Sequence, residues 1–378
     1  LQMKLVSEHA QGFNLFHACA VSHGNLANEP KTERTIVVDL VREPRSEGGV
    51  SIPARERRWV TPTFHAQSLL SHFGRGAAVA TDAAYQEAGD RDVFAQVYRQ
   101  DDAYRLFFLN TNATEERVQS IYLGAGAEPV GGLITYTLQA DAESPMEASN
   151  EPAAPNHVGP PAPGYYLPLE TNYFVWSLPP ASMTAMDIQL ASETSEPRNL
   201  MGHVACPETN LLLRGVTVDA LVDGDVAASA TTNVFGVYEF RGLPPGEYVF
   251  RVNAPGYDVV EPDVVIEPGE YYGLVFEAHP TLSGWVLRYG SGVPVEGALV
   301  WADGTDCVTQ ADADGQFFLC LPPGEYTVMA ATHEKETPLV GVAIGAVTVP
   351  LTSTPQCVEF TLDSNPIHRK FKSCYEED

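Results

Sequence analysis

The chain contains the same six residues, LPPGEY, twice, at Leu243–Tyr248 and at Leu321–Tyr326. Each copy follows a glycine and a stretch in which aromatic or aliphatic residues alternate with polar ones, and the alternation resumes after each copy. Alternation with a period of two is typical of half-buried β-strands. Pro-Pro-Gly reverses a chain because proline presets φ and glycine accepts a positive φ. Each hexamer is therefore predicted to form a strand–turn–strand corner in one of two copies of a duplicated domain.

The duplication extends upstream of each hexamer. GHVACPETNLLLRGVTVDA from Gly202 aligns with GWVLRYGSGVPVEGALVWA from Gly284. The pattern of Gly-x-aromatic-x-apolar, then Leu-Pro-x-Gly-x-Tyr and another strand, resembles the prealbumin-like repeats known as carboxypeptidase regulatory-like or Cna-B-type domains. The resemblance covers 198–280 and 281–364. It implies two seven-stranded β-sandwiches that serve as spacers, stalks or binding accessories.

Residues 76–195 contain a further set of strand patterns. Alternating apolar runs occur in 93–124, in GGLITYTLQA and in YYLPLETNYFVWSLPPASMTAMDIQL, with polar turns between them. Such runs favour an antiparallel β-sandwich. The segment 141–164 is rich in proline, alanine and acidic residues. We expect it to be an exposed, poorly ordered loop, with a docking segment for a partner as the alternative.

The signals differ ahead of this sandwich. TPTFHAQSLLSHF predicts a helix with Thr61 as its cap, Pro62 at the first helical position, and Leu69, Leu70 and Phe73 on one apolar face. MKLVSEHAQ is typical of a helix end and GFNLFHACA of a buried strand. The apolar helix face must be covered by the adjoining sandwich, by a further chain segment or by another subunit.

This order of elements and the closing motif VWSLPPASMTAMDI resemble the C-terminal end of retaining glycoside hydrolases of the (β/α)8-barrel clan. The heparanase-like, β-xylosidase-like and arabinofuranosidase-like families are examples. The resemblance covers about 1–195 and implies that 1–75 is a remnant of such a barrel. The two catalytic carboxylates of the clan lie at the ends of barrel strands four and seven, which would precede Leu1. The resemblance therefore implies that this chain is not an enzyme.

Taken together, these patterns predict a mainly β fold. Three consecutive β-sandwich domains, at 76–195, 198–280 and 281–364, would be preceded by the short α/β barrel remnant at 1–75. Residues 365–378 would form a tail.

The six cysteines bear on the compartment. Cys307 and Cys320 lie symmetrically about the turn DADG, so a regular hairpin would bring them together as a directly opposed pair within disulfide range. We expect a disulfide here, with two reduced thiols as the alternative. A disulfide would indicate an oxidising, extracellular setting. Whether Cys357 pairs with Cys374 stays open, and Cys19 and Cys206 have no assigned partner.

Two further residue groups are candidate modification or ligand sites. Asn112 begins an Asn-Ala-Thr glycosylation acceptor, which is a sign of a surface loop in a secreted protein. Four aspartates near the same DADG turn carry the hard oxygen ligands that calcium prefers, although aspartate is also a favoured turn residue. They are Asp303, Asp306, Asp312 and Asp314. The spacing of a complete calcium loop is missing, so no metal and no cofactor are expected.

Composition narrows the choice of partners. The net charge is −27, with 22 basic residues against 49 acidic ones, and the longest basic cluster is HRKFK. Nucleic acid is a poor partner for such a chain because phosphate binding needs concentrated lysine and arginine. The sequence contains no apolar run of the roughly 20 residues that a membrane span requires.

An exposed aromatic platform would favour glycan binding. The candidate residues are Tyr165, Tyr166, Tyr173 and Trp176, and strand alternation places at least half of them in a core. The resulting functional prediction is a non-catalytic extracellular structural or adhesive protein, a stalk or filament subunit derived from a glycoside hydrolase-like polypeptide. Its partner would be a second copy, another extracellular protein or a glycan. The alternatives are an accessory chain of an active glycosidase whose barrel lies upstream or on a separate chain, and a carbohydrate-binding module.

Overall fold

The computed structural model is almost entirely β-structure, with one α-helix and one short 3₁₀-helix, η2 (Pro366–His368), among the residues it describes. This confirms the predicted mainly β fold. The described residues are 19–22, 37–42, 45–47, 50–53, 55–60, 62–79, 92–139, 158–192, 196–209, 211–259, 263–266, 273–305, 307–332, 342–350, 355–363 and 365–374.

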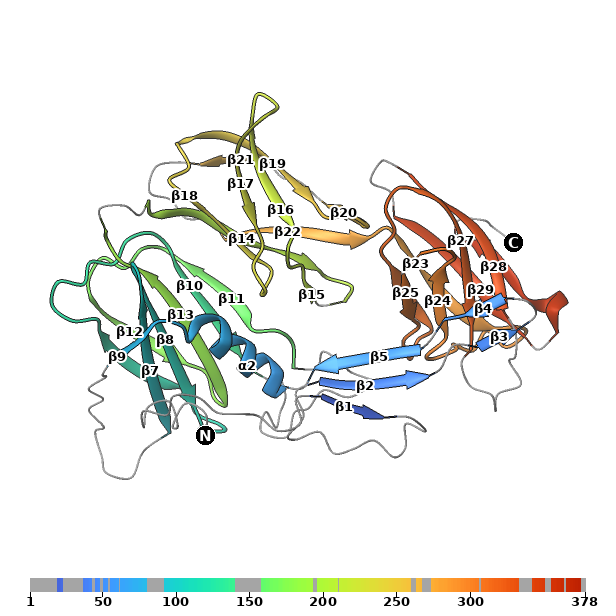
Figure 1. The fold of residues 1–378 in the computed structure, drawn as a ribbon, viewed down its shortest axis with the longest axis horizontal. Helices are drawn as coiled ribbons and strands as arrows, with labels where there is room; N and C mark the ends of the chain where they lie inside the picture. Colours follow the sequence, from blue (N-terminus) through green and yellow to red (C-terminus); the bar gives the residue numbers. More distant parts are fainter. Residues whose placement is uncertain are drawn as a thin grey trace.

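The first sandwich is antiparallel. Its strands are β6 (Ala77–Val79), β7 (Val93–Gln100), β8 (Ala103–Asn110), β9 (Arg117–Tyr122), β10 (Leu133–Leu138), β11 (Ala162–Tyr166), β12 (Tyr173–Leu178) and β13 (Ser182–Gln189). The larger sheet has the order β11-β10-β13-β8-β7-β6, and β12 pairs with β9 in a smaller sheet (Figure 1). Leu106, Leu133 and Met186 are buried in the cluster between the two sheets. The alternation in the sequence is therefore the alternation between this core and the opposite faces.

The last residues of the expected loop belong to a strand. Residues 141–157 lie outside the described residues, but Val158 is 3% exposed and β11 pairs with β10 from Ala162 to Tyr166. The prediction of an exposed loop over 141–164 is therefore wrong for its last residues. Tyr165 and Tyr166 follow directly and can pair with β10 as a strand, despite the proline-rich composition before them.

The predicted helix is α2 (Pro62–Phe73), which begins at the proline. Proline fits the first helical turn because its missing N–H would have no helical partner there. Leu69 and Phe73 are 0% and 2% exposed and pack with Tyr136 and Phe107 on the outer face of the large sheet. The apolar face of the helix is thus covered within the chain, so it gives no reason to expect another subunit there.

The second sandwich contains one parallel strand pair. Its strands are β14 (Arg198–Cys206), β15 (Leu211–Leu212), β16 (Thr217–Val222), β17 (Asp225–Thr231), β18 (Val237–Arg241), β19 (Gly246–Asn253), β20 (Tyr257–Val259), β21 (Asp263–Ile266) and β22 (Gly273–Pro280). One sheet has the order β15-β14-β22-β20, with β18 also on β14, and the other has the order β17-β16-β19-β21. β14 and β22 run parallel, and β14 and β18 antiparallel.

The third sandwich has its strands paired in a corresponding order. They are β23 (Leu282–Arg288), β24 (Leu299–Ala302), β25 (Val308–Gln310), β26 (Gln316–Leu319), β27 (Gly324–Ala331), β28 (Val342–Val349), β29 (Gln356–Leu362) and β30 (Lys370–Ser373). The sheets have the orders β26-β23-β29-β30 and β25-β24-β27-β28, and β23 and β29 run parallel. β30 comes from the segment expected to be a tail and is instead the edge strand beside β29.

Both hexamers form the predicted corners. Leu243 and Leu321 are 4% and 0% exposed, and β19 and β27 begin at the glycine of each hexamer. The hydroxyl of Tyr248 donates to the Pro244 carbonyl at 2.7 Å, and that of Tyr326 donates to the Pro322 carbonyl at 2.8 Å. The tyrosine therefore ties the new strand back to the turn, which gives a physical role to the last residue of the repeated motif.

The N-terminal strands extend away from the first sandwich. They are β1 (Cys19–Ser22), β2 (Val37–Arg42), β3 (Arg45–Glu47), β4 (Val50–Ile52) and β5 (Arg55–Val60). β1 pairs parallel with β2, β2 pairs antiparallel with β5, and β3 pairs with β4. We call β2 to β5 the arm. Residues 1–18 lie outside the described residues, and the identity of 1–75 as a barrel remnant stays a prediction.

The arm reaches the third sandwich (Figure 1). Ile52 is 0% exposed and packs with Leu299, Trp301 and Met329 on the β24–β27 sheet. These residues form a separate apolar cluster on the side of that sheet away from the main core of the sandwich. No local pattern in the sequence indicates this contact, because Ile52 lies far from its partners along the chain.

The cysteines correct one prediction. Cys307 and Cys320 are free thiols in the structure, so the predicted disulfide between them is wrong. The DADG turn does not close a regular hairpin, because β25 pairs with β24 in one sheet and β26 pairs with β23 in the other. Cys357 and Cys374 do form a disulfide. Cys206 is a buried free thiol, and nothing is described of the Cys19 side chain.

Candidate binding surfaces

The four residues of the predicted aromatic platform lie in three different places. Tyr166 and Trp176 meet edge to face with ring centroids 4.8 Å apart. Tyr165 is stacked on His203 of the second sandwich, and the Tyr165 hydroxyl lies 3.1 Å from the His203 Nδ1. Burial raises the pKa of Tyr165 and lowers the pKa of His203, as expected for two rings enclosed at a contact between domains. Tyr165 is therefore part of a joint and not of a binding platform.

Tyr173 lies on an exposed sheet face beside Tyr122, which is not among the residues predicted to form the platform. Tyr173 is directly opposite Tyr122 across the β9–β12 pair, and they are 53% and 62% exposed. The Tyr173 hydroxyl donates to the Ser120 hydroxyl at 3.2 Å, and Val118 and Val175 are exposed beside them. We call these five residues the aromatic face. Tyr122 could be found only from the strand register, which the sequence does not give.

The glycosylation acceptor forms a tight turn. The Asn112 Oδ1 accepts hydrogen bonds from the backbone N–H groups of Thr114 (3.0 Å) and Glu115 (2.8 Å). The Asn112 Nδ2 donates to Asp92 at 3.0 Å. Glycosylation would take place at that nitrogen, so it would compete with the contact to Asp92. Modification of Asn112 stays a prediction.

The candidate calcium ligands that the structure describes are exposed turn residues. Asp303, Asp312 and Asp314 are exposed, and Asp306 lies outside the described residues. The Asp312 Oδ1 accepts from the N–H groups of Asp314 (2.9 Å) and Gln316 (2.8 Å), which accounts for its presence in the turn. Within the described residues, no group of three or more histidine, cysteine or acidic side chains could hold a metal ion.

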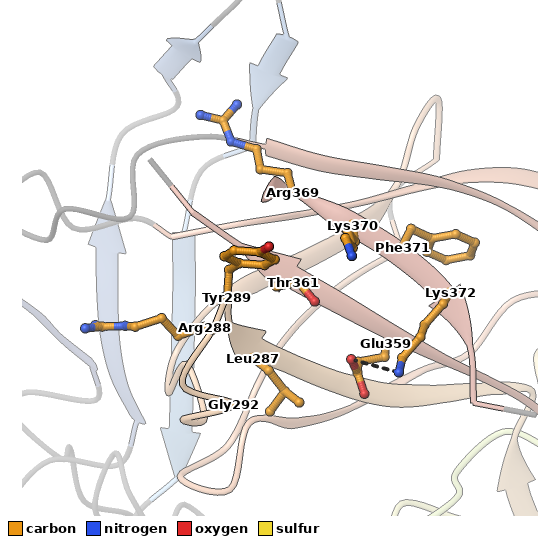
Figure 2. Close-up of a pocket in the computed structure, with 11 residues that line it drawn as sticks. Leu287, Arg288, Tyr289, Gly292, Glu359, Thr361, Arg369, Lys370, Phe371 and Lys372 are labelled. Atoms are coloured by element: carbon orange, nitrogen blue, oxygen red, sulfur yellow. Dashed lines mark ion pairs between the residues drawn. The ribbon is translucent and has the colours of Figure 1, made fainter. Parts of the chain in front are cut away.

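A basic groove lies on the third sandwich and was not predicted. It has a volume of about 560 Å³. We define the basic groove by its lining residues, which are Leu287, Arg288, Tyr289, Gly290, Gly292, Glu359, Thr361, Arg369, Lys370, Phe371 and Lys372. Figure 2 shows Tyr289, Thr361 and Lys370 close together, while Arg288 and Arg369 extend away at the margins.

Strand register builds one side of this groove. Lys372 lies opposite Glu359 and Lys370 opposite Thr361 across β29 and β30. The Lys372 Nζ is 3.6 Å from the Glu359 carboxylate. Between the two lysines, Phe371 points the other way and packs on the core of the sandwich. The alternation in KFKS thus holds the strand by its phenylalanine and presents both lysines on the outer side.

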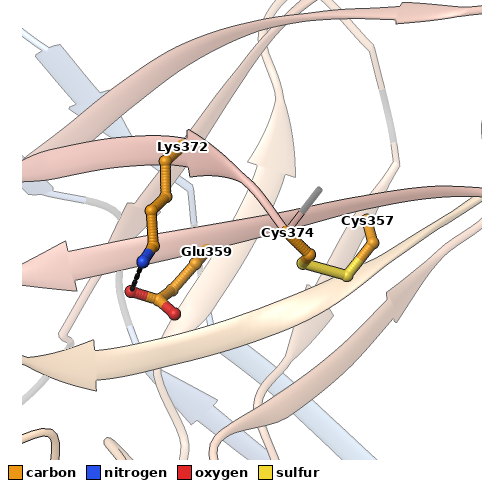
Figure 3. Close-up of a disulfide and its surroundings, with 4 residues drawn as sticks. All are labelled: Cys357, Glu359, Lys372 and Cys374. Carbon is orange, nitrogen blue, oxygen red and sulfur yellow. Dashed lines mark ion pairs between the residues drawn. A yellow bond between two sulfur atoms is a disulfide. The ribbon is translucent and has the colours of Figure 1, made fainter. Parts of the chain in front are cut away.

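The disulfide holds the basic strand in place. Cys374 follows β30 directly and is bonded to Cys357 on β29 (Figure 3). The backbone N–H of Cys374 also donates to the Cys357 carbonyl at 3.0 Å. The basic residues of the C-terminal segment are therefore fixed to the sheet and do not form a free tail.

Tyr289 is fixed on the opposite side of the groove. Its ring is stacked on His368 with centroids 4.3 Å apart, and the His368 Nδ1 is 3.1 Å from the Asp363 carboxylate. The Lys370 Nζ is 5.7 Å from the Tyr289 ring centroid. A cation at that distance is attracted to the ring, so Tyr289 and Lys370 are held together.

The free thiols are poorly suited to nucleophilic chemistry. Burial raises the pKa of Cys206 and of Cys320. A cysteine nucleophile needs the thiolate, which a raised pKa disfavours.

Within the described residues, no helix is long and apolar enough to cross a membrane.

One family model matches part of the chain. It describes the carboxypeptidase regulatory-like domain and matches residues 199–278. This agrees with the resemblance expected for the second sandwich. No curated protein matches the chain.

Several solved glycosidases are weakly similar to the chain. An endoxylanase of glycoside hydrolase family 30 from Clostridium papyrosolvens has 16% identity and a TM-score of 0.25, covering 34% of this chain and 28% of its own. An arabinofuranosidase of family 51 from Xanthomonas axonopodis pv. citri has 16% identity and a TM-score of 0.31, covering 41% and 29%. An α-L-arabinofuranosidase from Thermotoga maritima has 13% identity and a TM-score of 0.28, covering 40% and 34%. This chain spans about a third or less of each glycosidase.

Proposed function

We propose that the chain is a non-catalytic extracellular scaffold that holds binding surfaces in a fixed arrangement. The observation that carries this proposal is that buried contacts join all three sandwiches. Domains joined by free linkers would move relative to one another. In this chain, buried or partly buried residues connect the first sandwich to the second, the second to the third, and the arm to the third.

The joint between the first and second sandwiches is apolar at one end and ionic at the other. Phe235 of the second sandwich is 3% exposed and stacks on Phe73 of α2 with centroids 5.8 Å apart. Arg198 lies between two carboxylates, at 3.0 Å from Asp187 of the first sandwich and 2.6 Å from Glu239 of the second. An arginine enclosed in this way fixes orientation, because a rotation of one domain would separate it from a partner.

Thr281 is one of the residues that join the second and third sandwiches. Thr281 lies between β22 and β23, and its hydroxyl donates to the Leu321 carbonyl at 2.7 Å and accepts from the Leu321 N–H at 3.0 Å. The Thr281 N–H donates to the Gly256 carbonyl at 3.3 Å. The Thr281 hydroxyl also lies 3.2 Å from the Gly256 carbonyl, so one side chain contacts both domains. The arm separately contacts the third sandwich through Ile52.

We also propose that 281–364 is a second copy of the domain found at 199–278. Three observations support this. Strand pairing follows a corresponding order in both sandwiches, each has a parallel pair between its first and last long strands, and each has a corner with the same tyrosine hydrogen bond. Carboxypeptidase regulatory-like domains used as spacers would suit a scaffold.

An extracellular location is supported by the disulfide between Cys357 and Cys374, because such bonds persist in oxidising compartments. The proposal that the chain is non-catalytic is supported for thiol chemistry by the raised pKa values of Cys206 and Cys320, which disfavour the thiolate.

The experiment is an assay of the purified full chain on aryl-glycosides of xylose, arabinose and glucose. We expect no turnover above that of a mock preparation. Turnover that persists through repurification and is lost on changing one Asp or Glu of the chain would contradict the proposal.

Small-angle scattering tests whether the domains are held rigidly. The scattering curve should match one rigid arrangement of the three sandwiches, and a curve that requires independently moving domains would count against the proposal.

The aromatic face favours carbohydrate binding as a second candidate function. Tyrosines that are exposed, adjacent and on a sheet offer flat apolar area of the kind that sugar rings contact. Neutral polysaccharides such as xylan should bind more weakly to the Tyr122→Ala/Tyr173→Ala variant than to the wild type. The Val226→Ala variant, at a 51% exposed position of the second sandwich, is the control. Equal binding by all three proteins would exclude this face.

A further inference from the structure

We propose that the basic groove of the third sandwich, together with Trp285 beside it, is a binding site for an anionic polysaccharide whose sugars carry carboxylate or sulfate groups. This inference does not depend on the scaffold proposal, because it concerns one face of one domain.

The first reason is local charge. The groove is lined by four cationic side chains and one acidic side chain, in a protein whose net charge is −27. At physiological ionic strength charges are screened beyond about 8 Å, so an anion in the groove responds mainly to the residues that line it. Within the described residues, neither Lys370 nor Arg288 forms an ion pair. Lys370 lies beside the Tyr289 ring in the groove, where a bound anion could contact both.

The second reason is the aromatic surface beside these charges. Trp285 and Tyr289 are both 38% exposed. Trp285 lies beside Glu359, and Glu359 beside Lys372, in one row across the sheet. Leu287, Thr361 and Lys370 form the next row. One outer face therefore carries apolar side chains on β23 and lysines on β30, with β29 between them. This arrangement suits a polymer that has both apolar ring faces and anionic groups.

The third reason is the use of the corresponding face in the second sandwich. There the parallel pair β14–β22 is covered by the first sandwich: Tyr165 stacks on His203, and a Cβ added to Gly273 would lie 2.9 Å from the Tyr165 ring. In the third sandwich, Trp285 and Tyr289 on the corresponding sheet remain exposed. The outer face of the β14–β22 pair is thus covered by the first sandwich, whereas the outer face of the β23–β29 pair is exposed.

The occupant is identified by complementarity. A second copy of this chain would bring mainly acidic surface, but it would not supply the repeated flat rings that Trp285 and Tyr289 can contact. A neutral polysaccharide would not use the positive charge that Lys370 and Arg288 bring to this face. A chain of anionic sugars satisfies both features. The ordered strand β30, held by Phe371 and by the Cys357–Cys374 disulfide, keeps the lysines in position before the ligand binds.

The experiment measures binding of the full chain to heparin, polygalacturonate and neutral xylan by isothermal titration calorimetry at 50 and 300 mM NaCl. We expect heparin or polygalacturonate to bind at least tenfold more tightly than xylan to this face, with affinity falling as salt rises. Lys370→Gln and Arg288→Gln should each weaken anion binding about tenfold, the loss expected for a charge-assisted hydrogen bond. Trp285→Ala should weaken it as well.

The matched control is Arg214→Gln, which removes one positive charge from an exposed position in the second sandwich. It should leave affinity within about twofold of the wild type, and all variants should keep the wild-type melting temperature. The proposal is overturned if Arg214→Gln weakens binding as much as Lys370→Gln, or if neither groove variant changes it. It is also overturned if the anionic polymers do not bind and light scattering instead shows salt-sensitive self-association lost in Lys370→Gln.

Discussion

Arg198 is a single residue on which the orientation of two domains depends. Its guanidinium is 3% exposed and donates to the Asp187 carboxylate, the Asp187 carbonyl (3.2 Å) and the Glu239 carboxylate. Burial by itself would lower the pKa of Arg198, but the two carboxylates more than offset it and hold the pKa above its usual value. The arginine is therefore charged at every accessible pH, and its removal would leave Asp187 buried without its cation.

Arg198→Met should lower the free energy of unfolding by about 3–5 kcal/mol, the usual cost of breaking a buried ion pair from one side. Arg251→Met is the control, because Arg251 pairs with Asp219 while its side chain is 51% exposed; exposed pairs contribute about 0–1 kcal/mol. Urea denaturation of both variants measures the difference. A loss below about 1 kcal/mol for Arg198→Met would show that the joint does not depend on this charge.

His65 makes stability depend on pH. It is 7% exposed on α2, and burial lowers its pKa to about 4, against an opposing hydrogen bond with the backbone of Val158. In the unfolded chain a histidine has a pKa of about 6.5. Between pH 6.5 and pH 4 the unfolded chain therefore binds a proton that the folded chain does not. Stability is retained above that window and falls as the pH decreases through it.

Between pH 7 and pH 5, the wild type should lose about 2 kcal/mol more stability than His65→Gln, since one pKa unit corresponds to about 1.4 kcal/mol. His72 and His203, whose pKa values are also lowered by burial, are present in both proteins and do not affect the comparison. Urea denaturation at the two pH values is the measurement. Parallel losses in both proteins would mean that His65 is accessible to protons in the folded chain.

At the scale of elements, one glycine permits each parallel strand pair. A Cβ added to Gly202 would lie 1.8 Å from the Leu274 carbonyl oxygen, and one added to Gly284 would lie 1.8 Å from that of Val358. Only hydrogen fits there, so the strands β14 and β22, or β23 and β29, could not approach with any other residue. This explains why the two aligned segments both begin with glycine.

Gly284→Ala should destabilise the protein by about 3 kcal/mol or more, because the added methyl must push β23 away from β29. Gly246→Ala, in the first hexamer, is the control: its nearest contact would be 3.6 Å, to the Tyr248 ring, and it should cost less than about 1 kcal/mol. Thermal unfolding compares them. Equal melting temperatures would mean that the parallel pair relaxes without loss.

The elements that could be predicted are those with a local signal. Alternation identified the strands of all three sandwiches, Pro62 marked the start of α2, and the hexamers marked two corners. The predictions that failed or were not made are those that require knowing which strands pair. Cys307 and Cys320 were placed opposite each other by assuming a hairpin, whereas the turn between them passes from one sheet to the other. The basic groove requires residues around 288, 360 and 370 to meet, and no local pattern encodes that meeting.

For the molecule as a whole, the arm is the contact that the sequence could not indicate. Ile52 lies in a short strand far from its partners in the chain, and those partners, Leu299 and Met329, come from the third sandwich. The arm therefore links the region before the first sandwich with the third (Figure 1). The third sandwich is therefore held by the arm as well as by its contact with the second sandwich.

Ile52→Asp should release the arm, because a charge at this 0% exposed position would be buried without a partner. We expect trypsin to cleave within 55–60 at least tenfold faster than in the wild type. Ile344→Asp, on β28 of the same sheet and 51% exposed, should leave the cleavage rate unchanged. If the two variants are cleaved at the same rate as the wild type, the arm is held by something other than Ile52.

The arm also imposes an order on biogenesis. A ribosome produces Ile52 long before Leu299 and Met329, so the arm has no apolar surface to occupy until the third sandwich has emerged and folded. Contacts between residues so far apart in the chain form late and slowly. A nascent or truncated chain that ends before the third sandwich would expose the isoleucine, and such chains are the ones that a chaperone or protease would recognise as unfinished.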